Sequence, residues 1–330
     1  MVPLLEKLES TITPKAIDAI GTALGIDAPL AQKGVRVIGP TLLGAFAKAA
    51  STPEGAASIM GRFSQSVDPA EVLSRALKSL SGGVGSSAEK MANILGGGSN
   101  AISSALSRSL GFDAGPLLNM GAPLFMGLLA DLARSRNLDA SGVAAMLEHE
   151  SAEFMSDPAS KGVARIVQSA LEAGDAAVAL RKSFTDADWT KIRMAPLATT
   201  YLIVTASSSK GSGAVQELGA AAGALMESIK TAAPSSLMGT AFGCGMTMHE
   251  LEKFKKNAPS RESVFAMIKE SMVAVKAKSP PDAQAFSDML MNVARKAAEA
   301  AKEGGFLGIG GRWVSEDEEK TLWDIKAALD

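Results

Sequence analysis

The sequence LGFDA at residues 110–114, continued by GPLLNMGAPLFMGLLADLA at residues 115–133, indicates the fold of the first half of this chain. An earlier segment has the same features, with LGIDA at residues 24–28 and PTLLG at residues 40–44. In both segments the glycine motif, the proline and a run of apolar and small residues come in the same order. Because neither copy carries an obvious reactive set, this apparent duplication predicts repeated helical packing and not catalysis.

Local signals within the two segments predict where helices end and bend. Gly25 and Gly111 follow apolar runs, where a left-handed residue commonly ends a helix. Pro40 and Pro123 lie at equivalent places in the two segments, and each is expected to begin a new helix or to kink one.

Helix starts are also marked along the chain. Thr13-Pro14 and Thr52-Pro53 place a capping residue before a proline, as at many helix N-termini. The run from Ser315 to Glu318 has the spacing of a capping box.

The composition favours an all-α protein. The 330 residues are 47% hydrophobic, only 5% aromatic and rich in glycine and methionine, and small residues allow helices to pack closely. Residues 201–204 form an apolar run that includes the β-branched Ile203 and Val204, but they lie within a helical pattern. We therefore predict duplicated helical bundle units, a helical C-terminal domain and at most a short hairpin near residues 305–314.

Composition shifts divide the predicted chain into four parts. Residues 1–80 form the first helical repeat and residues 81–156 the second. A helical connector covers residues 157–184, and a C-terminal helical domain covers residues 185–330.

Charge, cysteine content and hydropathy limit the class of protein. A formal net charge of −2 gives no general attraction to nucleic acid. The single cysteine, Cys244, excludes an intramolecular disulfide and fits a reducing cytoplasm. No signal peptide is recognised at the start. Residues 115–133 are long enough to span a membrane, but Asn119 and Pro123 interrupt them, so we expect a buried helix and no stable membrane insertion.

Two histidines suggest candidate metal ligands. His149 and Glu153 are four residues apart and share one face of a predicted helix. The alternative is a solvated helix end with Glu148 and Glu150 on its surface. Cys244, Met246, Met248 and His249 are a second candidate set, suited to Cu(I), although these residues also fit a buried helix junction.

The segments from Gly111 through Leu129, together with residues 94–100, resemble the YidB-like family of bacterial helical domains of unknown function. The resemblance covers about the first half of the chain. It implies an α-helical fold and carries no catalytic residues.

The C-terminal part is similar, more distantly, to tellurite-resistance TerB-like helical domains, which contain acidic turns between helices. The matching place is Gly304-Gly305 followed by VSEDEE at residues 314–319. This resemblance implies that Glu316 and Asp317 are candidate metal ligands. At the other corresponding place, residues 206–211, serines and a lysine replace the acidic residues, which does not suit a hard cation.

From these features we predict a non-enzymatic bacterial cytoplasmic protein without a cofactor, which interacts with protein partners or assembles with itself as a homo-oligomer. The candidate interface residues are Leu42, Leu43, Phe46, Phe125, Leu128 and Leu129. The alternative for these residues is that the two segments bury them against each other. The alternative functions are a stress-response module that binds a metal ion or small ligand through its C-terminal domain, and an enzyme of unknown type.

Overall fold

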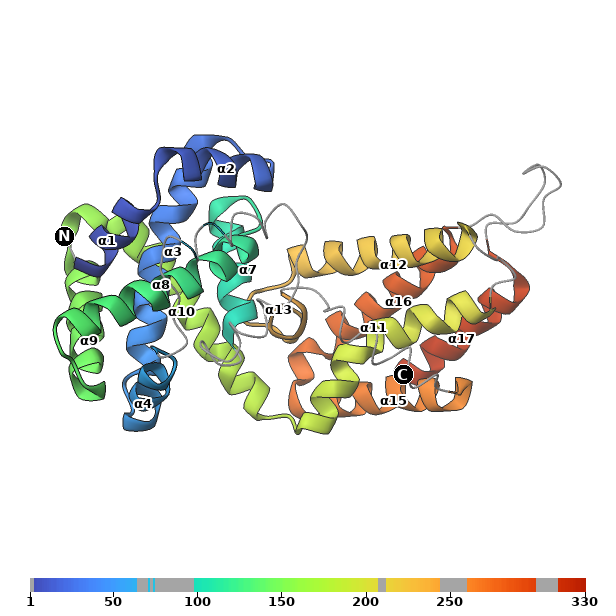
Figure 1. Ribbon diagram of the computed structural model, residues 1–330. Coiled ribbons are helices and arrows are strands. Elements are labelled where there is room, and N and C mark those ends of the chain that lie inside the picture. The colour runs from blue at the N-terminus through green and yellow to red at the C-terminus, as the bar shows by residue number, and fades with distance from the viewer. Residues whose placement is uncertain are drawn as a thin grey trace. The chain divides into compact units, whose positions relative to one another are not determined.

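The protein is all-α over the residues that the structure describes. The computed structural model describes residues 3–63, 71, 74, 98–206, 212–243, 260–300 and 314–330, and all regular structure in these ranges is helical (Figure 1). The predicted fold class is therefore confirmed. Residues 305–313 of the predicted hairpin lie outside the described ranges.

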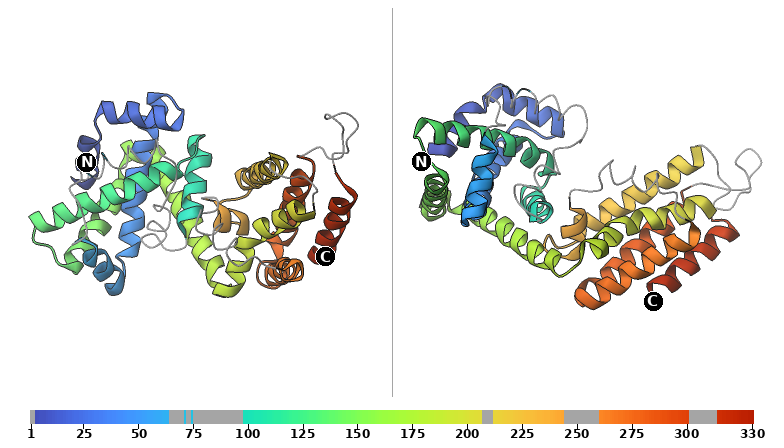
Figure 2. Two further views of the ribbon diagram at one scale, coloured as in Figure 1. Left: turned by 45° about the vertical axis from the view of Figure 1, so that its right-hand side comes forward. Right: turned by 60° about the horizontal axis from the view of Figure 1, so that its bottom comes forward.

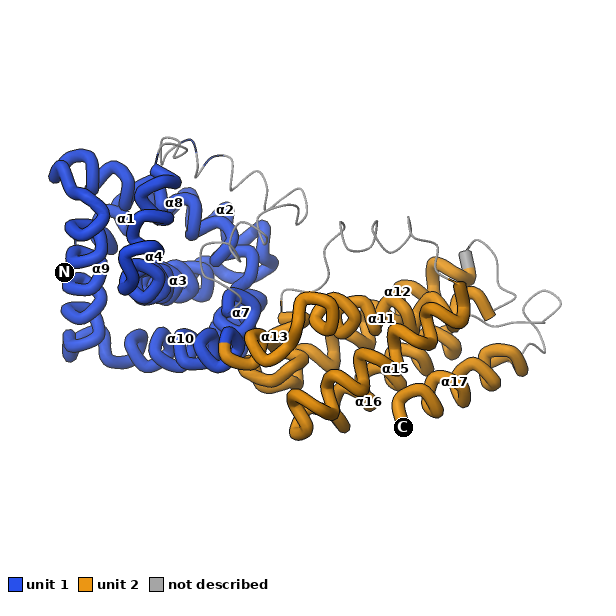
Figure 3. Tube along the Cα trace, turned by 90° about the horizontal axis from the view of Figure 1, so that it is seen from below, with its two compact units in different colours: residues 1–178 blue, residues 179–330 orange. Residues whose placement is uncertain are grey.

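The chain forms two compact units, residues 1–178 (unit 1) and residues 179–330 (unit 2), shown in Figure 3. The boundary falls within one helix, α10. The predicted parts 1–80 and 81–156 both lie within unit 1, and the predicted part 185–330 lies within unit 2.

Unit 1 is a bundle of short and long helices. Its elements are α1 (Pro3–Thr11), α2 (Pro14–Leu24), α3 (Ala28–Ala49), α4 (Pro53–Gly61), α7 (Ser99–Leu110), α8 (Gly115–Ser135), α9 (Ala140–Ser156), the 3-10 turn η3 (Pro158–Ser160) and most of α10 (Lys161–Lys182).

Local sequence chemistry explains several helix ends. Thr13 and Thr52 cap α2 and α4, and in each case the threonine hydroxyl accepts a backbone N–H at the third residue along. Gly25 and Gly111 follow α2 and α7 with φ of 66° and 82°, a region that favours glycine. These four predicted caps are confirmed.

The two internal prolines do not begin new helices. Pro40 lies within α3 and Pro123 within α8, and both helices continue past them. The residues around Pro40 are buried, so tertiary packing compensates for the hydrogen bond that proline cannot make. Of the described helices, only α8 is long and apolar enough to cross a membrane, and most of it is buried inside the protein, as in the core helix of a globular unit.

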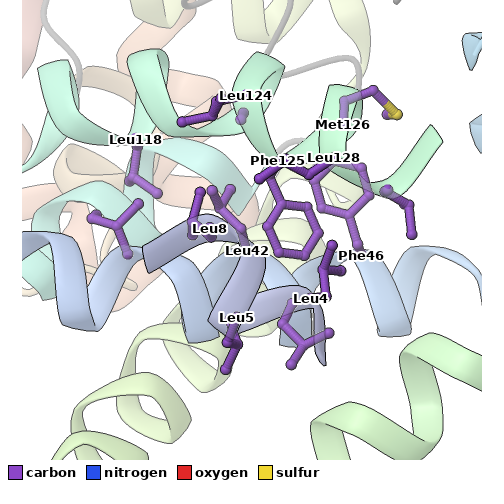
Figure 4. Packing of buried hydrophobic residues seen from close by; sticks show 14 of the residues in the cluster. Leu4, Leu5, Leu8, Leu42, Phe46, Leu118, Leu124, Phe125, Met126 and Leu128 are labelled. Carbon is purple, nitrogen blue, oxygen red and sulfur yellow. The ribbon is translucent and has the colours of Figure 1, made fainter. Parts of the chain in front are cut away.

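The core of unit 1 is built where α3 and α8 meet. The Phe46 and Phe125 rings stack with centroids 5.1 Å apart, and Leu42 and Leu128 lie beside them (Figure 4). All six predicted interface residues (Leu42, Leu43, Phe46, Phe125, Leu128 and Leu129) are buried in this cluster. They are core residues and not exposed contacts for another chain, which corrects that prediction. The reason is that the two apolar segments cover each other.

Unit 2 is made mainly of long helices that run side by side (Figure 2). Its elements are α11 (Asp186–Ala206), α12 (Ser212–Thr231), α13 (Leu237–Phe242), α15 (Arg261–Lys278), the 3-10 turn η4 (Pro280–Asp282), α16 (Ala283–Ala298) and α17 (Glu316–Leu329). Residues 201–204 lie in α11, so the helical prediction for this apolar run is confirmed. The core of unit 2 includes Phe242 and Phe286, both fully buried.

Candidate interaction surface

An apolar face of α12 is exposed to solvent. Val215 is 67% exposed, Leu218 46% and Met226 45%. The face also contains Gly219, Ala222 and Gly223, which are exposed as well. These residues are three or four apart, so they form one continuous stripe along the helix. The stripe extends about 16 Å, since each helical residue adds about 1.5 Å.

The opposite face of α12 accounts for its position in the unit. Ala221, Ala224, Leu225 and Ile229 are buried in the core of unit 2, and the helix packs along α16. Thus α12 is apolar on both its inner and its outer side. A helix that is apolar all round is typical of one that is covered on all sides.

The two glycines leave the outer face open to close approach. A Cβ atom added at Gly219 or at Gly223 would meet no atom within 4 Å. The stripe therefore combines protruding side chains with recesses where the backbone is accessible. Such a surface suits close packing against another helix.

Charge is absent from this stripe. Between Val215 and Met226 the only ionisable residue is Glu217, and its side chain is buried on the other side of the helix. Exposed charges follow the stripe at Glu227 and Lys230. An uncharged apolar patch of this kind marks a site of protein association in many soluble proteins.

The other large apolar side chains that are exposed in the described ranges are isolated on separate helices. Met155 is on α9, Val273 on α15 and Trp323 on α17. Single exposed apolar residues are common on protein surfaces. The α12 stripe differs because its exposed apolar and small residues are neighbours on one face of a single helix.

The first predicted metal pair is placed on an exposed helix face. His149 and Glu153 both lie on the surface of α9, one turn apart. Within the described residues, no group of three or more histidine, cysteine or acidic side chains is placed to hold a metal ion. Cys244, Met246, Met248 and His249 lie outside those residues.

The acidic start of α17 has a structural explanation. Ser315 and Glu318 form the predicted capping box, in which each side chain accepts the other residue's backbone N–H. Glu316 and Asp317 are exposed in the first turn, where negative charge stabilises a helix.

Glu150 departs from the alternative interpretation of α9 as a solvated helix end. Its side chain is only 2% exposed. Oε2 accepts a hydrogen bond from the backbone N–H of Leu4, in the first turn of α1, at 3.2 Å. Oε1 is buried and has no hydrogen-bond partner among the described residues. Burial raises the pKa of this carboxyl, whereas the Leu4 N–H and the nearby Arg136 act to lower it.

Neither the buried position of Glu150 nor the α12 stripe was predicted from the sequence. A spacing signal for α12 was present, since Gly219 and Gly223 are four apart among alanines and larger apolar residues. The same pattern also describes a buried helix, so spacing alone does not identify the exposed side.

Comparisons with known proteins find a match for the first part of the chain only. No curated protein and no solved structure matches the chain significantly. Residues 6–131, from α1 to α8, are similar to a family described as "Bacterial protein of unknown function (DUF937)".

Proposed function

We propose that the chain is a non-enzymatic bacterial cytoplasmic protein that assembles with a second copy of itself, and that α12 forms the contact. The observation that carries this proposal is the exposed apolar stripe from Val215 to Met226. It replaces the buried residues of α3 and α8 as the candidate interface.

The stripe is self-complementary, which favours a second copy as the occupant. In a twofold contact the same surface faces itself, so protrusions must fit recesses on an identical partner. Val215, Leu218 and Met226 protrude, while Gly219 and Gly223 leave open space. No exposed charge lies between Val215 and Met226, so two copies would bring no like charges together at the centre of the contact.

Light scattering after size exclusion tests this proposal on the full chain. The expected mass is that of a dimer, and Ala222→Glu should convert it to a monomer because it places a charge at the centre of the stripe. Val273→Glu is the matched control, since it adds the same charge at an exposed apolar residue on α15. Circular dichroism should show unchanged helicity in both variants. A monomeric native chain, or equal effects of the two variants, would contradict the proposal.

The internal duplication and the relation of its copies to the YidB-like family are further proposals. Two features support the duplication: Gly25 and Gly111 both end a helix in the left-handed conformation, and Pro40 and Pro123 both lie within the long helix that follows. The TerB-like similarity of residues 185–330 stays a prediction.

The alternative function, a stress-response module that binds a metal ion or small ligand through residues 185–330, also stays a prediction. Calorimetric titration with Ca²⁺, Zn²⁺ and Cu(I) tests its metal-binding form, and the absence of heat with all three ions would refute that form.

A further inference from the structure

A groove of about 420 Å³ lies between α3 and α10 in unit 1. Its lining comprises Pro29, Gln32, Lys33, Arg36 and Val37 from α3, and Gly162, Val163 and Ile166 from α10.

The groove lies where α3 and α10 diverge, and nearer their C-terminal ends the two helices are in contact. Further along them, Gly44 lies against Leu171, and Lys48 pairs with Asp175. The groove and these contacts follow in the same order along α3 and along α10, so the helices run in the same direction. The groove therefore opens toward their N-terminal ends.

The walls of the groove are apolar. Val37 is buried, and the half-buried Val163 and Ile166 pack against the core of unit 1. A site of a few hundred Å³ with apolar walls and a few polar groups is typical of small-molecule binding.

The rim of the groove carries two cations. Lys33 and Arg36 are one turn apart on α3, and both are exposed. Neither makes a hydrogen bond or an ion pair with any residue that the structure describes. The lining contains no acidic residue. The acidic residues nearest in sequence, Asp27 and Asp157, accept hydrogen bonds from Leu30 and from Ala159 and Ser160.

We propose that this groove binds a free amphipathic anion, a straight-chain carboxylate whose hydrocarbon chain lies along Val37, Val163 and Ile166. The carboxylate would pair with Lys33 and Arg36, because guanidinium and ammonium groups make strong charge-assisted hydrogen bonds to carboxylates. Apolar walls with cations at one rim complement a molecule that is apolar along its length and negative at one end. This binding site is separate from the α12 contact and does not depend on it.

Titration calorimetry of the full chain with dodecanoate, below the concentration at which it forms micelles, tests this proposal. The expected result is one site per chain, with little binding of dodecyltrimethylammonium, which has the same chain and the opposite charge. Lys33→Ala and Arg36→Ala should each weaken binding about tenfold, the loss expected for one charge-assisted hydrogen bond. The matched control is Arg165→Ala, which removes an exposed cation of α10 outside the lining.

A second variant tests the groove itself. A Cβ atom at Gly162 would meet no atom within 4 Å, so Gly162→Leu should fold and fill the groove, abolishing dodecanoate binding. The proposal is overturned if dodecanoate does not bind, if both surfactants bind equally, or if Arg165→Ala weakens binding as much as Arg36→Ala. Binding to anionic phosphatidylglycerol vesicles without binding to dodecanoate would also overturn it, because Lys33 and Arg36 would then bind the headgroups of a membrane surface and not a free carboxylate.

Discussion

Glu150 gives the sharpest test of how unit 1 is held together. Its Oε2 atom accepts the Leu4 N–H from a helix that lies 146 residues earlier in the chain. Glu150→Met keeps a side chain of similar length but removes the acceptor, leaving a backbone donor in the first turn of α1 without its partner. Such a loss costs about 1–2 kcal/mol. The amides of α1 should then exchange with solvent roughly 5–30-fold faster.

Hydrogen exchange with mass spectrometry on peptides that cover α1 measures this effect. Glu148→Met is the matched control, because Glu148 is exposed on the same helix two residues away and should leave α1 unchanged. Equal exchange of α1 in the two variants would refute the conclusion that Glu150 anchors this helix.

Because the pKa of Glu150 is raised in the folded chain, the contribution of this residue to stability changes with pH in a definite direction. Burial is the main cause of the increase above the ordinary value of 4.5, and it outweighs the Leu4 N–H, Arg136 and His149; Glu153 also raises it. The folded chain therefore holds this proton more tightly than the unfolded chain does. The contribution of Glu150 to stability is fully present below pH 4.5 and is lost as the pH rises through its raised pKa.

Urea denaturation at a series of pH values tests that sign. Glu150→Gln does not titrate at this position, so the native chain should lose stability relative to this variant as the pH rises from 4 to 7. A difference between the two proteins that stays constant with pH would show that Glu150 titrates as it does in the unfolded chain.

Three further outcomes are expected. Gly55→Ala should destabilise unit 1 by about 3 kcal/mol or more in urea denaturation, because its Cβ would lie 1.8 Å from the backbone oxygen of Ala49; Gly61→Ala on the same helix has open space and should be neutral or slightly stabilising. Phe125→Asp should unfold unit 1, seen as lost helicity, because it buries an unpaired charge in the core; retained helicity with an altered oligomer would instead favour the original interface interpretation. Ser315→Ala should cost about 1 kcal/mol and speed amide exchange in α17, and an unchanged exchange rate would show that the capping box contributes little.

The local features of the fold could be predicted from neighbouring residues. Thr13 and Gly25 bound α2 because their side-chain and backbone chemistry acts over only a few residues. The capping box at Ser315 is predictable for the same reason. The helix signals also gave the all-α class, since strand alternation is nearly absent from the sequence.

The interface prediction failed for a physical reason that the sequence does not contain. The apolar run around Phe125 requires a covering surface, but its composition does not specify whether that surface belongs to the same chain or to another. The structure supplies it from α3, through Phe46.

The sequence by itself determined the helices, their caps and the apolar character of α8 and α12. Only the tertiary structure decided which apolar faces are covered, because burial depends on residues brought together from distant parts of the chain. Thus Phe125 is enclosed, whereas Val215 is left in solvent although its helix is also rich in apolar residues. The same holds for a polar residue. Glu150 is buried and bonded to the Leu4 N–H because α1, from a distant part of the chain, packs against α9 there.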